Sequence, residues 1–166
     1  MAPATSNPSL APETMAVVEE LDRFAARPEV MAALQRARMQ AEQRLRREPS
    51  LRAASAALEP SSLGWTAADK VGSIRVSVTR DADGDGIERH VNSTQYLLAL
   101  GTPVHTHVQT ADGWRIDCYG QGDSAALQDR WHVVPPGLWH KTVAPGASFW
   151  GIVAFHSARE VSDEYR

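Results

Sequence analysis

The chain has 166 residues, a formal net charge of −3 and 43% hydrophobic residues, a composition that is ordinary for a globular domain with its own core. The negative charge argues against nucleic acid as the main partner, because phosphate binding requires a basic surface. No apolar run approaches the ~20 residues of a membrane span, and the N-terminus has no secretory signal pattern. The single cysteine, Cys118, allows no internal disulfide, so we expect a cytoplasmic protein without a membrane partner.

The first third of the chain is expected to be helical. Residues 1–12 are rich in Pro, Ser and Ala, which predicts a disordered tail. Residues 13–60 form a predicted N-terminal helical segment, because apolar residues recur at the helical period and Pro28 and Pro49 mark its breaks. Residues 50–58 are expected to add a short third helix.

The pattern changes to that of strands in the remaining chain, residues 61–166. Ile74, Val76 and Val78 alternate with polar residues, and further short apolar segments follow between turns rich in Gly and Pro. Short strands with close turns indicate an antiparallel barrel or jelly roll. The predicted fold class is therefore mainly β, with an N-terminal helical segment.

Two histidine motifs carry the chemical signal of the sequence. The first is His105-Thr106-His107, and the second is Pro135-Pro136-Gly137-Leu138-Trp139-His140. Two histidines that are two residues apart on a strand point to the same face, so both imidazoles can converge on one metal. A third histidine after a Pro/Gly turn can close the site from a neighbouring strand. The motifs therefore predict a metal site at His105, His107 and His140, and three imidazoles suit Fe, Zn, Cu or Ni.

These residues resemble the two motifs of the cupin superfamily over about residues 71–158. The first cupin motif is similar to His105, His107, Asp112 and Gly120, and the second to Pro135, Gly137 and His140. The resemblance implies a double-stranded β-helix, the jelly-roll barrel of cupins. It also implies a fourth metal ligand, for which Asp112 is the candidate and Gln109 the alternative, because the usual glutamate of the first motif is absent.

Other residues are candidates for supporting roles. Tyr119 and His132 are the candidate catalytic bases. His90, His132 and His156 could donate to a ligand, shuttle a proton or simply be structural. At least one tryptophan is expected to line the pocket, and the candidates are Trp114, Trp131, Trp139 and Trp150.

The resemblance implies a metal-dependent enzyme that acts on a small organic molecule, most often a non-haem Fe(II) dioxygenase, with Zn, Ni, Mn and Cu as other candidate metals. Two alternatives stay open. One is an isomerase, lyase or decarboxylase on the same three-histidine site, with His132 or Tyr119 moving a proton. The other is a non-catalytic ligand-binding or sensor cupin. We also expect a homodimer, because a barrel of about 90 residues leaves strand edges and apolar faces exposed.

Overall fold

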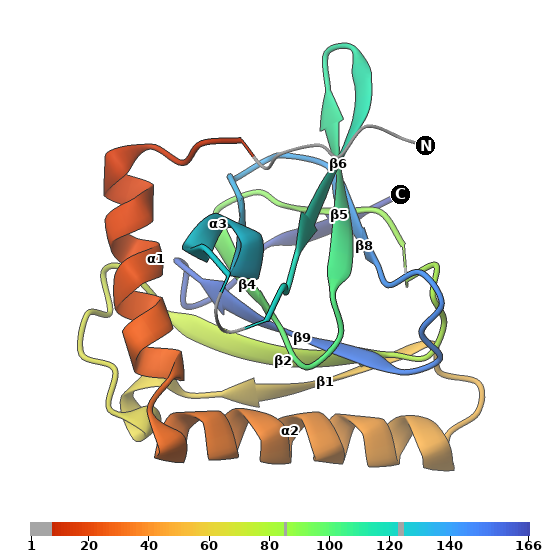
Figure 1. Ribbon diagram of the computed structural model, residues 1–166. Coiled ribbons are helices and arrows are strands. Elements are labelled where there is room, and N and C mark those ends of the chain that lie inside the picture. The colour runs from red at the N-terminus through yellow and green to blue at the C-terminus, as the bar shows by residue number, and fades with distance from the viewer. Residues whose placement is uncertain (1–7, 85, 123–124) are drawn as a thin grey trace.

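The computed structural model describes residues 8–84, 86–122 and 125–166. Two antiparallel five-stranded sheets face each other, and helices pack on the outside of one of them (Figure 1). The helices are α1 (Pro12–Ala25), α2 (Pro28–Arg47), the short α3 (Leu127–Arg130) and a 3-10 turn, η1 (Pro60–Leu63). The strands are β1 (Ala53–Leu58), β2 (Ser73–Thr79), β3 (Glu88–His90), β4 (Gln95–Ala99), β5 (Val104–Thr110), β6 (Gly113–Tyr119), β7 (Trp131–Val134), β8 (His140–Val143), β9 (Trp150–His156) and β10 (Asp163–Tyr165). The mainly β fold with N-terminal helices confirms the predicted fold class.

The two long helices form a layer over one sheet. Each begins with a proline, whose fixed backbone suits the first turn, and each carries a glutamate in that turn. Their apolar faces pack on the outer side of the sheet with strand order β1-β2-β9-β4-β7 (Figure 1). The resulting core includes Leu21, Leu34, Val76, Val153 and Phe155. Among the described residues, no helix is long and apolar enough to cross a bilayer.

The predicted third helix is wrong, because residues 53–58 form strand β1. This strand pairs with β2 along its whole length, from Ala53 opposite Thr79 to Leu58 opposite Ile74. Its alanines favour a helix locally, but propensity is a weak preference that tertiary contacts override. Here Ala54 joins a buried cluster with Leu45 of α2. Residues 53–58 are therefore part of the barrel wall.

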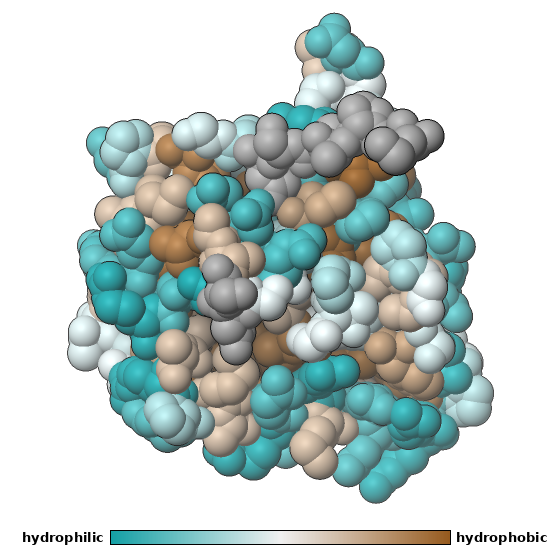
Figure 2. Space-filling view, viewed as in Figure 1, coloured by the Kyte–Doolittle hydropathy of each residue, from teal (hydrophilic) through white to brown (hydrophobic). Residues whose placement is uncertain are grey.

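The second sheet has the order β10-β3-β8-β5-β6 and faces the first across the interior of the barrel. Apolar residues fill one part of that interior, where Leu97, Val104, Tyr119 and Trp150 form a buried cluster. Polar and titratable side chains occupy the rest. The hairpin that joins β5 to β6 projects from the body of the molecule (Figure 1), and its tip is largely hydrophilic (Figure 2).

Candidate metal centre

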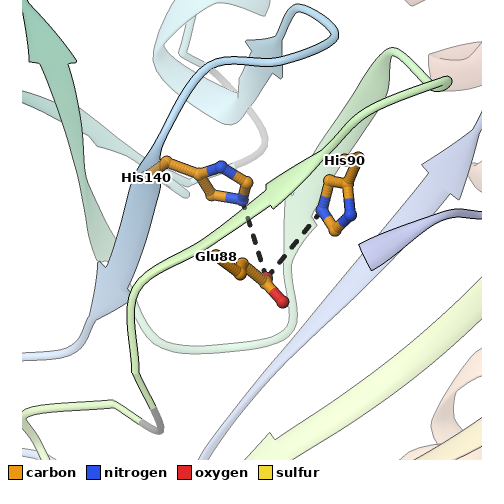
Figure 3. Close-up of side chains that lie close together, drawn as sticks. All are labelled: Glu88, His90 and His140. Carbon is orange, nitrogen blue, oxygen red and sulfur yellow. Dashed lines mark ion pairs between the residues drawn. The ribbon is translucent and has the colours of Figure 1, made fainter. Parts of the chain in front are cut away.

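Three potential metal ligands meet inside the barrel, from strands β3 and β8. Glu88 and His90 are two residues apart on β3 and face the same way, and Glu88 is the register partner of His140 on β8. One ligand atom from each residue lies within 4.8 Å of the other two (Figure 3). Glu88 Oε1 is 3.6 Å from His140 Nε2 and 3.9 Å from His90 Nε2. In the described part of the chain, these residues make up the one His/Cys/Asp/Glu group that is close enough to hold a metal.

Both histidines are oriented by hydrogen bonds of their other ring nitrogen. His90 Nδ1 is 2.7 Å from Asp163 Oδ1, and His140 Nδ1 is 3.0 Å from the carbonyl of Leu138. Both partners accept, so each Nδ1 carries a proton, and in the neutral imidazole each Nε2 keeps a lone pair. The two Nε2 atoms are buried and have no hydrogen-bond partner, although such groups normally have one. This donor set fits a divalent metal.

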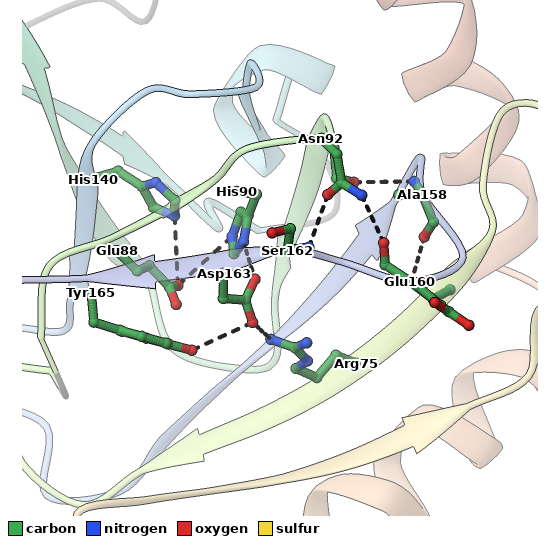
Figure 4. Close-up of polar contacts among 12 residues, drawn as sticks. Arg75, Glu88, His90, Asn92, His140, Ala158, Glu160, Ser162, Asp163 and Tyr165 are labelled. Carbon is green, nitrogen blue, oxygen red and sulfur yellow. Dashed lines mark hydrogen bonds and ion pairs between the residues drawn. The ribbon is translucent and has the colours of Figure 1, made fainter.

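Asp163 is itself held in place on β10 (Figure 4). It is the register partner of His90, and its Oδ2 accepts from Arg75 Nη1 at 3.1 Å and from the Tyr165 hydroxyl at 3.4 Å. Burial raises the pKa of the Asp163 carboxyl, but the hydrogen bond from His90 and the charge of Arg75 outweigh burial and hold the pKa below its usual range. Asp163 is therefore an ionised acceptor that fixes the ring of His90.

Glu88 is also ionised. Burial raises the pKa of its carboxyl, but a hydrogen bond from His140 and the positive charges of the protonated His140 and His90 hold that pKa below its usual range. A metal that displaces the Nε2 protons would therefore meet one carboxylate and two imidazole lone pairs.

The turn before β8 brings His140 beside β3. Gly137 has a φ of 76°, which glycine adopts without strain. Its N–H donates to the carbonyl of His90 at 2.8 Å. The Pro-x-Gly-x-x-His pattern therefore joins the turn directly to the strand that carries the other two candidate ligands.

Two further polar side chains lie on the facing sheet. The ring of His156 on β9 contacts His90 edge to face, with centroids 4.9 Å apart. Burial, together with the charges of His90 and Arg75, lowers the pKa of His156 to about 3. Its register partner Gln95 on β4 is 4% exposed. Both His156 nitrogens and Gln95 Oε1 are buried without a hydrogen-bond partner.

The candidate catalytic residues, Tyr119 and His132, lie together in the interior, where the charge of His140 acts on His132. Their rings stack with centroids 5.4 Å apart, and His132 Nε2 is 3.9 Å from Asp117 Oδ2. Burial lowers the pKa of His132 to about 4, which Asp117 partly opposes. Burial also raises the pKa of Tyr119 well above its usual range, although the hydroxyls of Thr106 and Thr142 oppose this. Both catalytic candidates are therefore neutral near pH 7.

His105 and His107 are not brought to His140, which corrects the predicted convergence of the three histidines. In β5 the side chains of Thr106 and Val108 are buried, whereas His105 and His107 are half-buried on the other face. Val108 is the register partner of His140, so the inward face of β5 is the one without histidines. The two-residue spacing does place both imidazoles on one face, but that face of β5 is the outer one.

The two candidates for a fourth ligand also lie away from the cluster. Asp112 is exposed in the turn at the tip of the β5–β6 hairpin. Gln109 is on the outer face of β5, where its Oε1 accepts from Arg166 at 2.9 Å. The role that the structure gives Asp112 is that of a turn residue.

The tryptophans divide between different environments. Trp150 belongs to the buried cluster inside the barrel, and Trp131 packs in the core beneath the helices. The guanidinium of Arg166 lies over the rings of Trp114 and Trp139.

Sequence reasoning missed Glu88 and assigned His90 a supporting role. The signal was present, because Glu88-x-His90 has the same two-residue spacing as His105-x-His107 and offers a carboxylate in place of one imidazole.

No protein-family model matches the sequence, and no curated protein matches it significantly. Solved structures are similar in fold. The Bacillus subtilis oxalate decarboxylase, described with Mn(II) centres, matches with a TM-score of 0.53 and 12% identity over 70% of this chain and 28% of that one. Peruvianin-I, a cysteine peptidase from Thevetia peruviana latex, matches with a TM-score of 0.47 and 16% identity over 57% of this chain and 55% of its own. The chain thus spans 28% and 55% of these two proteins.

Oxalate decarboxylase is a cupin, and the structural match to it covers more than two thirds of this chain. The two facing antiparallel sheets enclose a buried Glu-His-His cluster, whose third member follows a Pro-x-Gly-x-x-His turn. Architecture, site and the structural match to oxalate decarboxylase agree, and the chain has the cupin fold.

Proposed function

We propose that this chain is a metal-dependent cupin enzyme in which Glu88, His90 and His140 hold one divalent metal inside the barrel. The observation that carries the proposal is the convergence of a carboxylate and two unpartnered Nε2 atoms within 4.8 Å. Each imidazole already donates its other N–H to an acceptor, as metal-binding histidines do. The ionised Glu88 supplies a negative charge that favours a cation.

Iron(II) is the metal that the donor set supports best. Two histidines and one carboxylate with open positions are the ligands of non-haem Fe(II) oxygenases. Bound there, the metal would act as a Lewis acid and as a template that brings a substrate and O₂ together. Manganese is the next candidate, since the fold neighbour has Mn(II) centres; Zn, Ni and Cu follow.

The leading reaction class is therefore a dioxygenase-type oxidation of a small organic molecule. Within it, Asp163 keeps the ring of His90 in one orientation, and Arg75 keeps Asp163 ionised. The burial of His90 and His140, each 1% exposed, excludes bulk water from this side of the site.

A second candidate reaction is proton transfer in a decarboxylase, lyase or isomerase. The observation that favours it is His132, a neutral buried imidazole whose Nε2 has no hydrogen-bond partner. Nε2 could accept a proton, and Asp117 at 3.9 Å would stabilise the imidazolium. Tyr119, stacked on this ring, keeps its proton and can donate it. The named reaction of the fold neighbour is also a decarboxylation.

Metal analysis followed by two gas measurements tests the proposal. Protein purified without chelator should hold about one metal per chain after anaerobic loading with Fe(II). The His140→Ala variant should lose the metal, and His105→Ala, a histidine on the outer face of β5, should keep it. Consumption of O₂ with a panel of small carboxylic acids would support the dioxygenase, and CO₂ release without O₂ consumption would support the decarboxylase. Metal content that stays far below one per chain would instead favour a ligand-binding or sensor cupin.

We also propose that the protein is a cytoplasmic homodimer. The single cysteine supports a reducing compartment. Exposed apolar side chains, Trp114 at 44% and Ile116 at 39%, support an interface on the outer face of β6. Light scattering at micromolar concentration should give twice the mass of the 18.1 kDa chain; the mass of one chain would contradict the dimer and leave the metal centre unaffected.

A further inference from the structure

His156 has hydrogen-bonding capacity that the protein does not use. It is 1% exposed, and neither ring nitrogen has a hydrogen-bond partner. The ring carries at least one N–H donor in any protonation state it adopts in water. A buried donor without an acceptor is unfavourable, so evolution toward stability alone would have replaced this side chain.

Gln95, the register partner of His156, has an unused hydrogen-bond acceptor. Gln95 and His156 are register partners on β4 and β9, and the Gln95 side chain faces the same interior. Its Oε1 is buried and lacks a donor. Together the two residues therefore offer a donor and an acceptor at one place in the barrel.

This pair lies next to the candidate metal ligands. The ring of His156 contacts His90, and the charges of Glu88 and Asp163 act on it. A small group bound to a metal at Glu88, His90 and His140 would thus be adjacent to the ring of His156. Two other buried atoms without a hydrogen-bond partner, the Tyr119 hydroxyl and His132 Nε2, belong to the stacked pair of these two rings.

We infer that His156 and Gln95 bind a hydroxyl group of the substrate, which is a small hydroxycarboxylate or a close analogue. A hydroxyl can form hydrogen bonds with both residues at once, because it accepts from the His156 N–H and donates to Gln95 Oε1. The inference rests on the proposed metal site, which would bind the carboxylate group of the same ligand.

The net charge at the metal centre indicates that the rest of the ligand is an anionic group. A divalent cation on the single carboxylate of Glu88 leaves one net positive charge at the centre, since Asp163 is already paired with Arg75. A buried excess charge is unfavourable unless it is neutralised, and a substrate carboxylate supplies that neutralisation. The metal would thus take the carboxylate, while His156 and Gln95 take the hydroxyl.

Glycolate and acetate test this assignment, because both are monoanions and they differ by one hydroxyl. Calorimetry on Mn(II)-loaded full-length protein gives the affinity ratio of the two ligands. The same ratio is measured for Gln95→Leu and His156→Phe, with Gln109→Leu and His105→Phe as matched controls on the outer face of β5. Metal content is determined for every variant.

The wild type should prefer glycolate, and each interior variant should lower the ratio about tenfold, the effect of one lost hydrogen bond. Both controls should keep the wild-type ratio. A hydroxyl that chelates the metal instead of binding the pair would leave the preference for glycolate the same in the wild type and in all variants. An unchanged ratio in Gln95→Leu and His156→Phe with metal intact would mean that only water occupies the pair, and it would overturn the inference alone.

Two other outcomes separate this inference from the proposed function. Loss of metal from Gln95→Leu would make Gln95 a ligand of the metal and would overturn its role toward a hydroxyl. Failure of the wild type to retain Mn(II) or Fe(II) would overturn the metal site itself, and the inference with it.

Discussion

Val108 on β5 lies directly opposite His140 on β8, and both side chains are buried in the barrel. Alternate residues of a strand face opposite ways, so the adjacent register pair, His107 and Lys141, faces outward. These two strands therefore contribute a single histidine to the metal cluster, and β3 contributes the other two members.

Metal retention should depend on the residues of the cluster and not on the outer histidines. Glu88→Ala, His90→Ala and His140→Ala should each reduce bound metal from about one per chain to a small fraction, because each removes one of the three protein donors. His105→Ala and His107→Ala should retain metal as the wild type does. Plasma mass spectrometry of the dialysed proteins measures this, and loss of metal from His107→Ala would contradict the assignment.

Asp163 should strengthen metal binding without touching the metal. Replacing Asp163 with Asn removes the ionised acceptor that orients His90, and such partners are worth roughly 10–100-fold in metal affinity. Glu164→Gln is the matched control, since this carboxylate on the same strand pairs with Arg89 instead. Competition with a chelator of known affinity gives both constants. Equal metal affinities for the two variants would show that Asp163 does not support metal binding.

The metal-free protein should lose stability on acidification, with His132 as one cause. Its pKa is lowered from 6.5 to about 4 in the folded chain. The unfolded chain therefore binds more protons between these values, and the free energy of unfolding falls as the pH falls through this window. The full loss for one such histidine is on the order of 3 kcal/mol. Urea unfolding at several pH values should show a shallower slope for His132→Gln, and identical slopes would contradict this cause.

The helical layer should be a stabilising part of the domain. Leu34 of α2 is fully buried against the outer face of the first sheet. The Leu34→Ala variant should lower the free energy of unfolding by about 2–5 kcal/mol, because it leaves a cavity. Met39 on the same helix is 59% exposed, and Met39→Ala should change stability by less than about 0.5 kcal/mol. Thermal or urea unfolding compares the two variants, and a similar cost for both would show that the layer is loosely attached.

The sequence was sufficient for the architecture because its periodicity changes clearly between the helices and the strands. Pro12 and Pro28 begin the two helices, and the alternation around Val76 matches the burial of β2. Strand β1 escaped prediction because its six residues, AASAAL, carry no alternation, and their conformation is set by β2 and α2.

The candidate site was predictable in part. The turn at Gly137 located His140 correctly in the interior. The pair His105 and His107 was misleading, because a period of two fixes that both side chains share a face and leaves open which face is buried. That choice depends on the register of β5 with β8, a long-range property of the sheet.

Strand β3 is short, although it carries two of the three candidate metal ligands. It has three residues, and one register pair, Glu88 with His140, joins it to β8. A metal shared by those two residues and His90 would be a stronger link between the strands than their backbone pairing. A bound metal would therefore hold β3 against β8 at the rim of the barrel. Amide hydrogens of β3 and β10 should exchange slowly in the loaded protein and quickly in the empty one, because local opening of these strands must first release the ion.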